Sequence, residues 1–359
     1  MIARPRTLRR LGIVAICAVA SAGCGSSSSN TNGSSAKTAS SSSTAANTPT
    51  SATTSTAATG TGPPPAVAEL AAAEHPRASQ FPTAGGRTLQ ELASTVRASA
   101  QLGAATGTFT PGRGRFAFAL NASGGGFIYA PTAIYIARTP NSRAAGPFLA
   151  PADPLTVAPR YRSQQNTGPG GIQAIYAAQL PLPQAGTYTV LSLTRAAQGI
   201  IGAPGEIAVA PSSPIPAVGA RPPAIATDTA ASVAGNTSLL TTRSPPEQMQ
   251  SVSFKDALGK RPIALLFSTP QLCVSRVCGP VTDIAVQLQQ RFGTQVTFIH
   301  QEVYVNNQPK SGLRPQLKAF HLQTEPWLFT INRQGKITAR LEGSFGINAF
   351  TRALQAAMQ

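Results

Sequence analysis

Two cysteines in the last third of the chain are the residues best suited to do chemistry. The sequence contains four cysteines, and Cys273 and Cys278 stand close together with four residues between them. Paired thiols can form a disulfide, exchange with other disulfides or bind a soft metal ion. Most exported cysteine pairs form structural bridges. A structural disulfide and a redox-active pair are therefore both open at this point.

The elements predicted around the pair place it between a strand and a helix. Residues 263–268 form a continuous apolar run, which is typical of a strand buried on both faces. Apolar residues at helical spacing over 281–292 predict an amphipathic helix that begins near Pro280. Two residues five positions apart in a helix are separated by ~7.5 Å along the axis, beyond the ~7 Å limit for a disulfide. If the pair bridges, Cys273 must therefore lie in the loop before the helix. The positive end of the helix dipole and Arg276 would then lower a thiol pKa.

The remaining elements of the C-terminal part, residues 248–359, continue an α/β pattern. Three further strands and two helices are predicted, with the strands at 296–303, 327–331 and 336–342 and the helices at 313–320 and 347–358. The turn at 332–335 ends in glycine and suits a hairpin. The order is a βαβ unit followed by a hairpin and a terminal helix.

This C-terminal part resembles thioredoxin-fold proteins. The segment from Phe267 to Pro280, which reads FSTPQLCVSRVCGP, is similar to their active-site segment, and residues 324–327, TEPW, are similar to their cis-proline loop. The resemblance implies thiol-disulfide exchange on cysteine-containing envelope proteins. It also implies that Cys273 is the attacking thiol, Cys278 the resolving thiol and Pro326 the cis-proline that shapes the substrate groove.

The sequence departs from the thioredoxin pattern at several positions. Thioredoxins have two residues between the cysteines, whereas this chain has four. Leu266 stands roughly where thioredoxins keep a buried acid, Leu272 replaces a tryptophan, and Glu325 is unusual before the proline. The redox behaviour of the family is therefore not transferred to this chain.

Two alternatives to an oxidoreductase stay open. The domain is also similar to the TlpA-like and Sco-type members of the superfamily, and a Sco-like copper metallochaperone would use Cys273, Cys278 and His321 as ligands. Otherwise we expect no cofactor. The second alternative is a non-enzymatic envelope module with a structural disulfide. His300 is expected simply to end a strand. Two thiols without well-spaced partners do not make a zinc site, and no GxSxG motif indicates a hydrolase.

The N-terminus predicts export and a lipid anchor. Residues 1–23 combine a basic segment, a short apolar run and small residues before Cys24, which resembles a bacterial lipoprotein signal. Cys24 would then carry the lipid, and the protein would be extracytoplasmic and anchored to the cell membrane. Residues 24–63 are rich in Ser, Thr and Ala and predict a disordered tether.

Between the tether and the C-terminal part, the sequence predicts three further segments. Residues 64–104 form a short helical prelude, with helical patches at 66–74 and 88–98. Residues 105–211 contain five short β-like runs, which predict an all-β immunoglobulin-like sandwich. The run at 186–193 alternates in side-chain type, so one of its faces is expected to be buried and the other partly exposed. Residues 212–247 are Pro-rich and predict a connector. The whole chain is therefore predicted to be multidomain, and it resembles actinobacterial lipoproteins that place a sandwich before a thioredoxin-fold domain.

The positive charge does not indicate a nucleic-acid partner. The formal net charge is +17, but only six of the 29 basic residues are lysines, and the arginines are scattered singly. A nucleic-acid surface would need basic residues gathered in a stripe or a patch.

Overall fold

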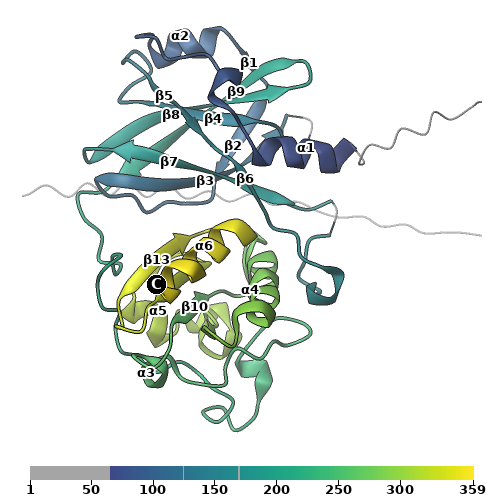
Figure 1. Ribbon diagram of the computed structural model, residues 1–359, viewed down its shortest axis with the longest axis vertical. Coiled ribbons are helices and arrows are strands. Elements are labelled where there is room, and N and C mark those ends of the chain that lie inside the picture. Colours follow the sequence, from purple (N-terminus) through teal and green to yellow (C-terminus); the bar gives the residue numbers. More distant parts are fainter. Residues whose placement is uncertain (1–64, 124, 169) are drawn as a thin grey trace, which may run out of the picture. The chain divides into compact units, whose positions relative to one another are not determined.

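Figure 1 shows the computed structural model of the chain, in which residues 65–123, 125–168 and 170–359 are described. These residues belong to one compact unit with a mixed α/β fold and contain three β-sheets. Within these ranges, no helix is long and apolar enough to cross a membrane. The predicted signal segment, Cys24 and the tether lie outside the described residues.

The first sheet has five strands in the order β1-β9-β8-β4-β5. All neighbours are antiparallel except β1 and β9, which run parallel. The second sheet has four antiparallel strands in the order β2-β3-β7-β6. The strand bounds are β1 Arg97–Ala98, β2 Ala100–Ala104, β3 Gly112–Ala122, β4 Thr132–Ala137, β5 Ala145–Leu149, β6 Ala152–Pro154, β7 Ala174–Leu182, β8 Gly186–Ala196 and β9 Gly199–Val209. We call these nine strands and their connections the β region.

The two sheets of the β region share one hydrophobic core. Ile134 and Val190 of the first sheet belong to the same buried cluster as Phe118 and Tyr176 of the second. The rings of Phe118 and Tyr176 stack with their centroids 5.4 Å apart. The five strands predicted in this part of the sequence are all present as strands β3, β4, β7, β8 and β9.

The segment before the β region corrects two expectations from the sequence. The helical patch predicted at 88–98 forms helix only as α2, Leu89–Ser94, and the residues that follow pair as β1 and β2. The outer face of β8 was expected to be partly exposed, but Leu191 and Leu193 are buried there against Leu89, Leu92 and Phe81. Packing against the sheet therefore decides the structure here, because a short helix gains most of its stability from tertiary contacts.

The third sheet forms the centre of the C-terminal α/β region, with the order β11-β10-β12-β13. Its strands are β10 Ile263–Phe267, β11 Thr297–Gln301, β12 Trp327–Ile331 and β13 Ile337–Glu342. β10 and β11 run parallel, and β12 lies antiparallel to both β10 and β13. Each of these strands was predicted, and their bounds differ by only a few residues.

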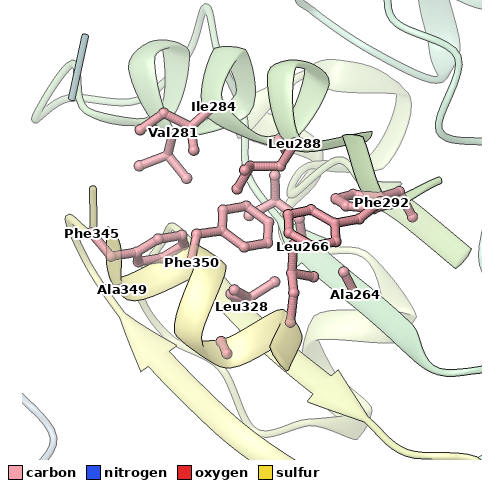
Figure 2. Close-up of a cluster of buried hydrophobic side chains, with 14 of the residues drawn as sticks. Ala264, Leu266, Val281, Ile284, Leu288, Phe292, Leu328, Phe345, Ala349 and Phe350 are labelled. Carbon is pink, nitrogen blue, oxygen red and sulfur yellow. The ribbon is translucent and has the colours of Figure 1, made fainter. Parts of the chain in front are cut away.

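Helices cover both faces of this third sheet. α4, Cys278–Phe292, and α6, Ile347–Met358, pack on one face, where Leu288 and Phe350 meet Leu266 and Leu328 (Figure 2). α3, Phe254–Ala257, and α5, Pro315–Ala319, contribute to the cluster on the other face. α4 begins at Cys278 and not at Pro280, because a glycine before proline has no Cβ to clash with the ring. The other helices are α1 Pro65–Glu74 and the short 3-10 helices Ala78–Gln80, Pro159–Tyr161, Thr237–Leu239, Val305–Asn307 and Pro309–Ser311.

The β region and the C-terminal α/β region are joined by buried polar contacts. Asp153 of β6 accepts hydrogen bonds from the backbone amides of Gly346, Asn348 and Ala349 at 3.0, 2.9 and 2.9 Å. These amides begin α6, where the first N–H groups have no partner inside the helix. A carboxylate from one region therefore caps a helix of the other.

Candidate functional site

The two cysteines lie at the carboxyl end of β10, where the chain turns into α4. Cys273 is in the loop, and its amide donates to the carbonyl oxygen of Thr269 at 3.1 Å. Its carbonyl accepts from the amide of Arg276, which has a left-handed backbone conformation with φ of 57°. Cys278 is the first residue of α4. The expectation that Cys273 precedes the helix is confirmed.

The two thiols have different environments although both are buried free cysteines. The Ser275 hydroxyl lies 3.2 Å from the Cys273 sulfur, and Cys278 is the neighbour that lowers the pKa of Cys273 most. Hydrogen bonds from Cys278, Ser275 and the backbone at Val277 and Cys278 outweigh burial and lower the pKa of Cys273 to about 6. Burial, followed by the hydrogen bond to Cys273, raises the pKa of Cys278 well above its ordinary value. Cys273 is therefore the thiolate of the pair, and Cys278 is the protonated donor.

A second segment lies near the sulfurs. The peptide bond between Glu325 and Pro326 is cis, as predicted, and Pro326 is buried. Burial and then the negative charge on Cys273 raise the pKa of Glu325 to about 7. Burial and then the charges of Glu325 and the two cysteines raise the pKa of Tyr304. Glu325 and Tyr304 therefore stand within electrostatic reach of the sulfurs, and no feature of the sequence pointed to Tyr304.

His321 does not join the cysteines in a ligand cluster. It is exposed on the turn after α5, where its backbone has φ of 57°. In the part of the chain that the structure describes, no three His, Cys, Asp or Glu side chains gather in a way that could hold a metal ion. The set Cys273, Cys278 and His321 is therefore not assembled.

His300 forms a buried ion pair with Glu247. Its Nδ1 donates to Glu247 Oε1 at 2.6 Å, and both side chains are excluded from solvent. Burial opposes the charge on each group, but the pairing outweighs it, so the pKa of Glu247 is lowered to about 2 and the pKa of His300 is raised. His300 was expected to end its strand but lies one residue before the last residue of β11, Gln301, and Glu247 comes from the segment predicted to be only a connector.

This ion pair is linked to the cysteine helix through hydroxyl groups. The other ring nitrogen of His300 lies 2.8 Å from Ser268 Oγ and 3.0 Å from the Ser268 carbonyl oxygen. Ser268 Oγ lies 2.8 Å from Thr282 Oγ1, which donates to the carbonyl oxygen of Cys278 at 2.8 Å. Because the carboxyl ends of parallel strands meet at one sheet edge, the polar residues after β10 and at the end of β11 were the signal that could have revealed this network.

A second buried ion pair holds three distant segments together. Arg243 Nε donates to Asp283 Oδ1 of α4 at 2.9 Å, and its Nη2 donates to the carbonyl oxygen of Tyr161 at 2.7 Å. Asp283 Oδ2 accepts from the Ser163 amide at 3.0 Å and from Asn166 Nδ2 at 3.1 Å. The connector, the cysteine helix and a loop of the β region therefore meet at one carboxylate.

We expect the alkylation rate of Cys273 to rise with pH, with a midpoint near its pKa of about 6. Replacing Ser275 with Ala removes one hydrogen bond to the thiolate, so the midpoint should rise by roughly 0.5 to 1 pH unit. The measurement is the iodoacetamide rate at Cys273 across pH, followed by mass spectrometry of the modified peptide. The matched control is Ser94→Ala, whose exposed hydroxyl bonds only to the carbonyl of Glu91. Equal midpoints in wild type and Ser275→Ala would contradict the assignment.

The His300–Glu247 pair should stabilise the protein most in mildly acidic solution. A group with a raised folded-state pKa loses its contribution as pH rises, and a group with a lowered pKa loses it as pH falls. Urea unfolding measures the free energy of unfolding of wild type and of the double variant Glu247→Gln/His300→Gln. The difference between the two should be largest between pH 4.5 and 6.5, the ordinary pKa values of the two groups. It should shrink as the pH rises through the raised pKa of His300 and the imidazole loses its proton. A difference that does not change with pH would contradict the charged state of the pair.

Comparison with known proteins adds no family to this description. No family model matches the chain, and a search of curated proteins found no match. The chemistry of the site is therefore argued from the arrangement of Cys273, Cys278, Glu325 and their neighbours.

Proposed function

We propose that this protein carries out thiol-disulfide exchange through Cys273 and Cys278. The observation that supports it most is the difference between the two thiols. Cys273 is held as a thiolate by convergent hydrogen bonds, whereas Cys278 is buried and protonated beside it. A nucleophilic thiolate with an adjacent resolving thiol is what exchange requires.

The proposed reaction proceeds in two exchanges. The Cys273 thiolate attacks one sulfur of a substrate disulfide, so a mixed disulfide forms and the other substrate sulfur leaves as a thiolate. Cys278 then loses its proton and attacks the Cys273 sulfur, which forms the Cys273–Cys278 disulfide and releases the second substrate sulfur. The substrate disulfide is reduced and the protein dithiol is oxidised, and a thiol donor in the same compartment restores the dithiol.

The first exchange prepares the second one electrostatically. The hydrogen bond to Cys273 and its negative charge both raise the pKa of Cys278, and both are lost once Cys273 is in a mixed disulfide. Glu325, whose pKa stays raised by burial after the charge on Cys273 is gone, is then a carboxylate able to take up the proton of Cys278. General acid-base groups work best when their pKa lies near the operating pH.

The arrangement of the C-terminal region supports a thioredoxin-like fold for this chemistry. The sheet has the order β11-β10-β12-β13 with two helices on each face, and a cis-proline precedes β12. The cysteine pair follows β10, at the carboxyl end of a strand that is parallel to its neighbour. For the β region we propose an immunoglobulin-like sandwich, because its two sheets pack around one shared core.

A trapping experiment tests the proposed exchange. Cys278→Ser should accumulate a mixed disulfide with oxidised glutathione or a disulfide peptide, because the intermediate on Cys273 can no longer be resolved. Cys273→Ser, the matched control, should accumulate none, because the remaining thiol is buried. Intact mass with and without reductant measures both outcomes.

If Cys278→Ser accumulates no mixed disulfide, the result favours a structural disulfide between Cys273 and Cys278. In that case the Cys273–Cys278 bond resists physiological reductants, and each serine variant only lowers stability by ~2 to 5 kcal/mol. Tight binding of one copper ion by the reduced protein, lost in His321→Ala, would instead favour the metallochaperone alternative.

We also propose that the protein acts outside the cytoplasm on a lipid anchor at Cys24. The support is the order of basic, apolar and small residues before this cysteine. Its thiol-containing partners would then be envelope proteins, and the membrane contact would be made by the lipid.

Replacing Cys24 with Ala should abolish lipid attachment. The variant should then leave the membrane fraction or remain unprocessed, which fractionation and intact mass can follow. Cys17→Ala is the matched control, because a cysteine inside the signal would be removed with it. Membrane retention of a processed Cys24→Ala chain would contradict the anchor.

A further inference from the structure

We propose that a loop of the β region forms one wall of the thiol site and restricts it to disulfides with little bulk around their sulfur atoms. The wall consists of residues 163–166 and Ile172. This inference rests on the proposed exchange function and extends it to the class of substrate. It also gives the β region a role in the reaction of the C-terminal region.

The first observation is packing against the apolar cluster that contains both cysteines. Ile172 belongs to the small apolar cluster that contains Cys273, Val277 and Cys278. Cys273 is only 6% exposed, although the neighbouring Val274 is 94% exposed. The loop that carries Cys273 is therefore open to solvent, whereas the sulfur-bearing side chain is covered.

The second observation is a close backbone approach at the start of α4. A Cβ atom placed on Gly279 would lie 2.5 Å from the carbonyl oxygen of Gln165, which is closer than real Cβ contacts. Glycine at this position therefore lets the wall lie directly on the first turn of the cysteine helix. Any larger residue would push Gln165 away from it.

The third observation is that the wall is fixed by buried charge. The amide of Ser163 and the side chain of Asn166 both donate to Asp283 of α4, which is fully buried and paired with Arg243. Gln165 Oε1 accepts from the amide of Ser244 at 2.9 Å, and the amide of Gln164 donates to the Ser244 carbonyl oxygen at 2.8 Å. The two hydrogen bonds to the Asp283 carboxylate are charge-assisted, and such bonds are about twice as strong as neutral ones. The wall is thus attached to both α4 and the connector.

These contacts leave one side for the substrate. Gln271, Val274, Ser275 and Arg276 are exposed beside Cys273, so a disulfide can approach over this loop and opposite the wall. A small disulfide such as oxidised glutathione fits such an approach. An exposed disulfide on a flexible segment of an envelope protein fits it as well, whereas the atoms around a disulfide inside a folded protein would meet Ile172 before its sulfur reached Cys273.

The test compares small and bulky reagents at Cys273 in the reduced chain. Wild type should react with iodoacetamide much faster than with a maleimide that carries a polymer chain, relative to a model thiol. Ile172→Ala should raise the bulky-reagent rate about tenfold, which corresponds to a barrier lower by about 1.4 kcal/mol. The matched control is Ile200→Ala, a partly buried isoleucine of the β region that packs in a different cluster. This variant should keep the wild-type rates.

A second variant tests the wall without removing an apolar contact. Residue 279 precedes Pro280, so an added Cβ also meets the proline ring, and the Gly279→Ala rates are compared only after its Cys273 is shown to keep the wild-type alkylation midpoint. The variant should then raise the bulky-reagent rate at Cys273, because the new Cβ displaces Gln165. Unfolding midpoints of all variants confirm that the folded chain is being compared.

Exchange assays separate this inference from the proposed function. Wild type should react with oxidised glutathione faster than with folded, disulfide-bonded ribonuclease, and Ile172→Ala should narrow this difference. The proposal would be overturned if wild type and Ile172→Ala had the same ratio of exchange rates with oxidised glutathione and with ribonuclease. It would also be overturned if Ile172→Ala and Ile200→Ala changed this ratio equally. If no disulfide is exchanged but the reagent selectivity changes as expected, the wall stands and the proposed function fails.

Discussion

The buried ion pair between Arg243 and Asp283 is the constraint on which the arrangement of the site depends. Isolated charges are costly in a protein interior, so each must be fully paired and hydrogen-bonded. Asp283 meets this requirement with donors from Arg243, Ser163 and Asn166, and Arg243 also donates to Tyr161 and to a carbonyl of its own segment. The connector, the β region and the cysteine helix can satisfy these groups only when they come together.

The asymmetry of the cysteine pair follows from where the helix begins. Cys278 is the first residue of α4 and is fully buried, whereas Cys273 lies in the loop with the Ser275 hydroxyl 3.2 Å from its sulfur. A thiolate is favoured by donors and by the positive end of a helix, and a thiol is favoured by burial. The same short segment therefore lowers the pKa of one thiol and raises the pKa of the other. One ring nitrogen of His300 lies within hydrogen-bond distance of both the hydroxyl and the carbonyl oxygen of Ser268. These contacts support the turn between β10 and the cysteines.

The elements with a strong local pattern were predicted correctly from the sequence. The apolar run that became β10, the stripe that became α4 and the terminal helix α6 each have a core-facing pattern that admits one structure. The patch that begins at Thr88 was different, because its residues suited a helix while the open edges of two sheets were available for pairing. β1 and β2 formed there, and α2 became the cover of β8. Competition of this kind depends on distant strands, so a local pattern could not decide it.

The residue pattern was enough to predict the strand and helix order of the C-terminal region and the place of Cys273 before its helix, and the thioredoxin resemblance added the cis bond before Pro326. The sequence could not determine which residues surround the sulfurs. Tyr304, Glu247, Arg243 and Ile172 come from segments far apart in the chain and carry no motif. Their roles arise from burial and from the pairing of charges across the interior, and these depend on which segments the folded chain brings into contact. The contacts of the β region and the connector with the cysteine helix therefore became visible only in the folded chain.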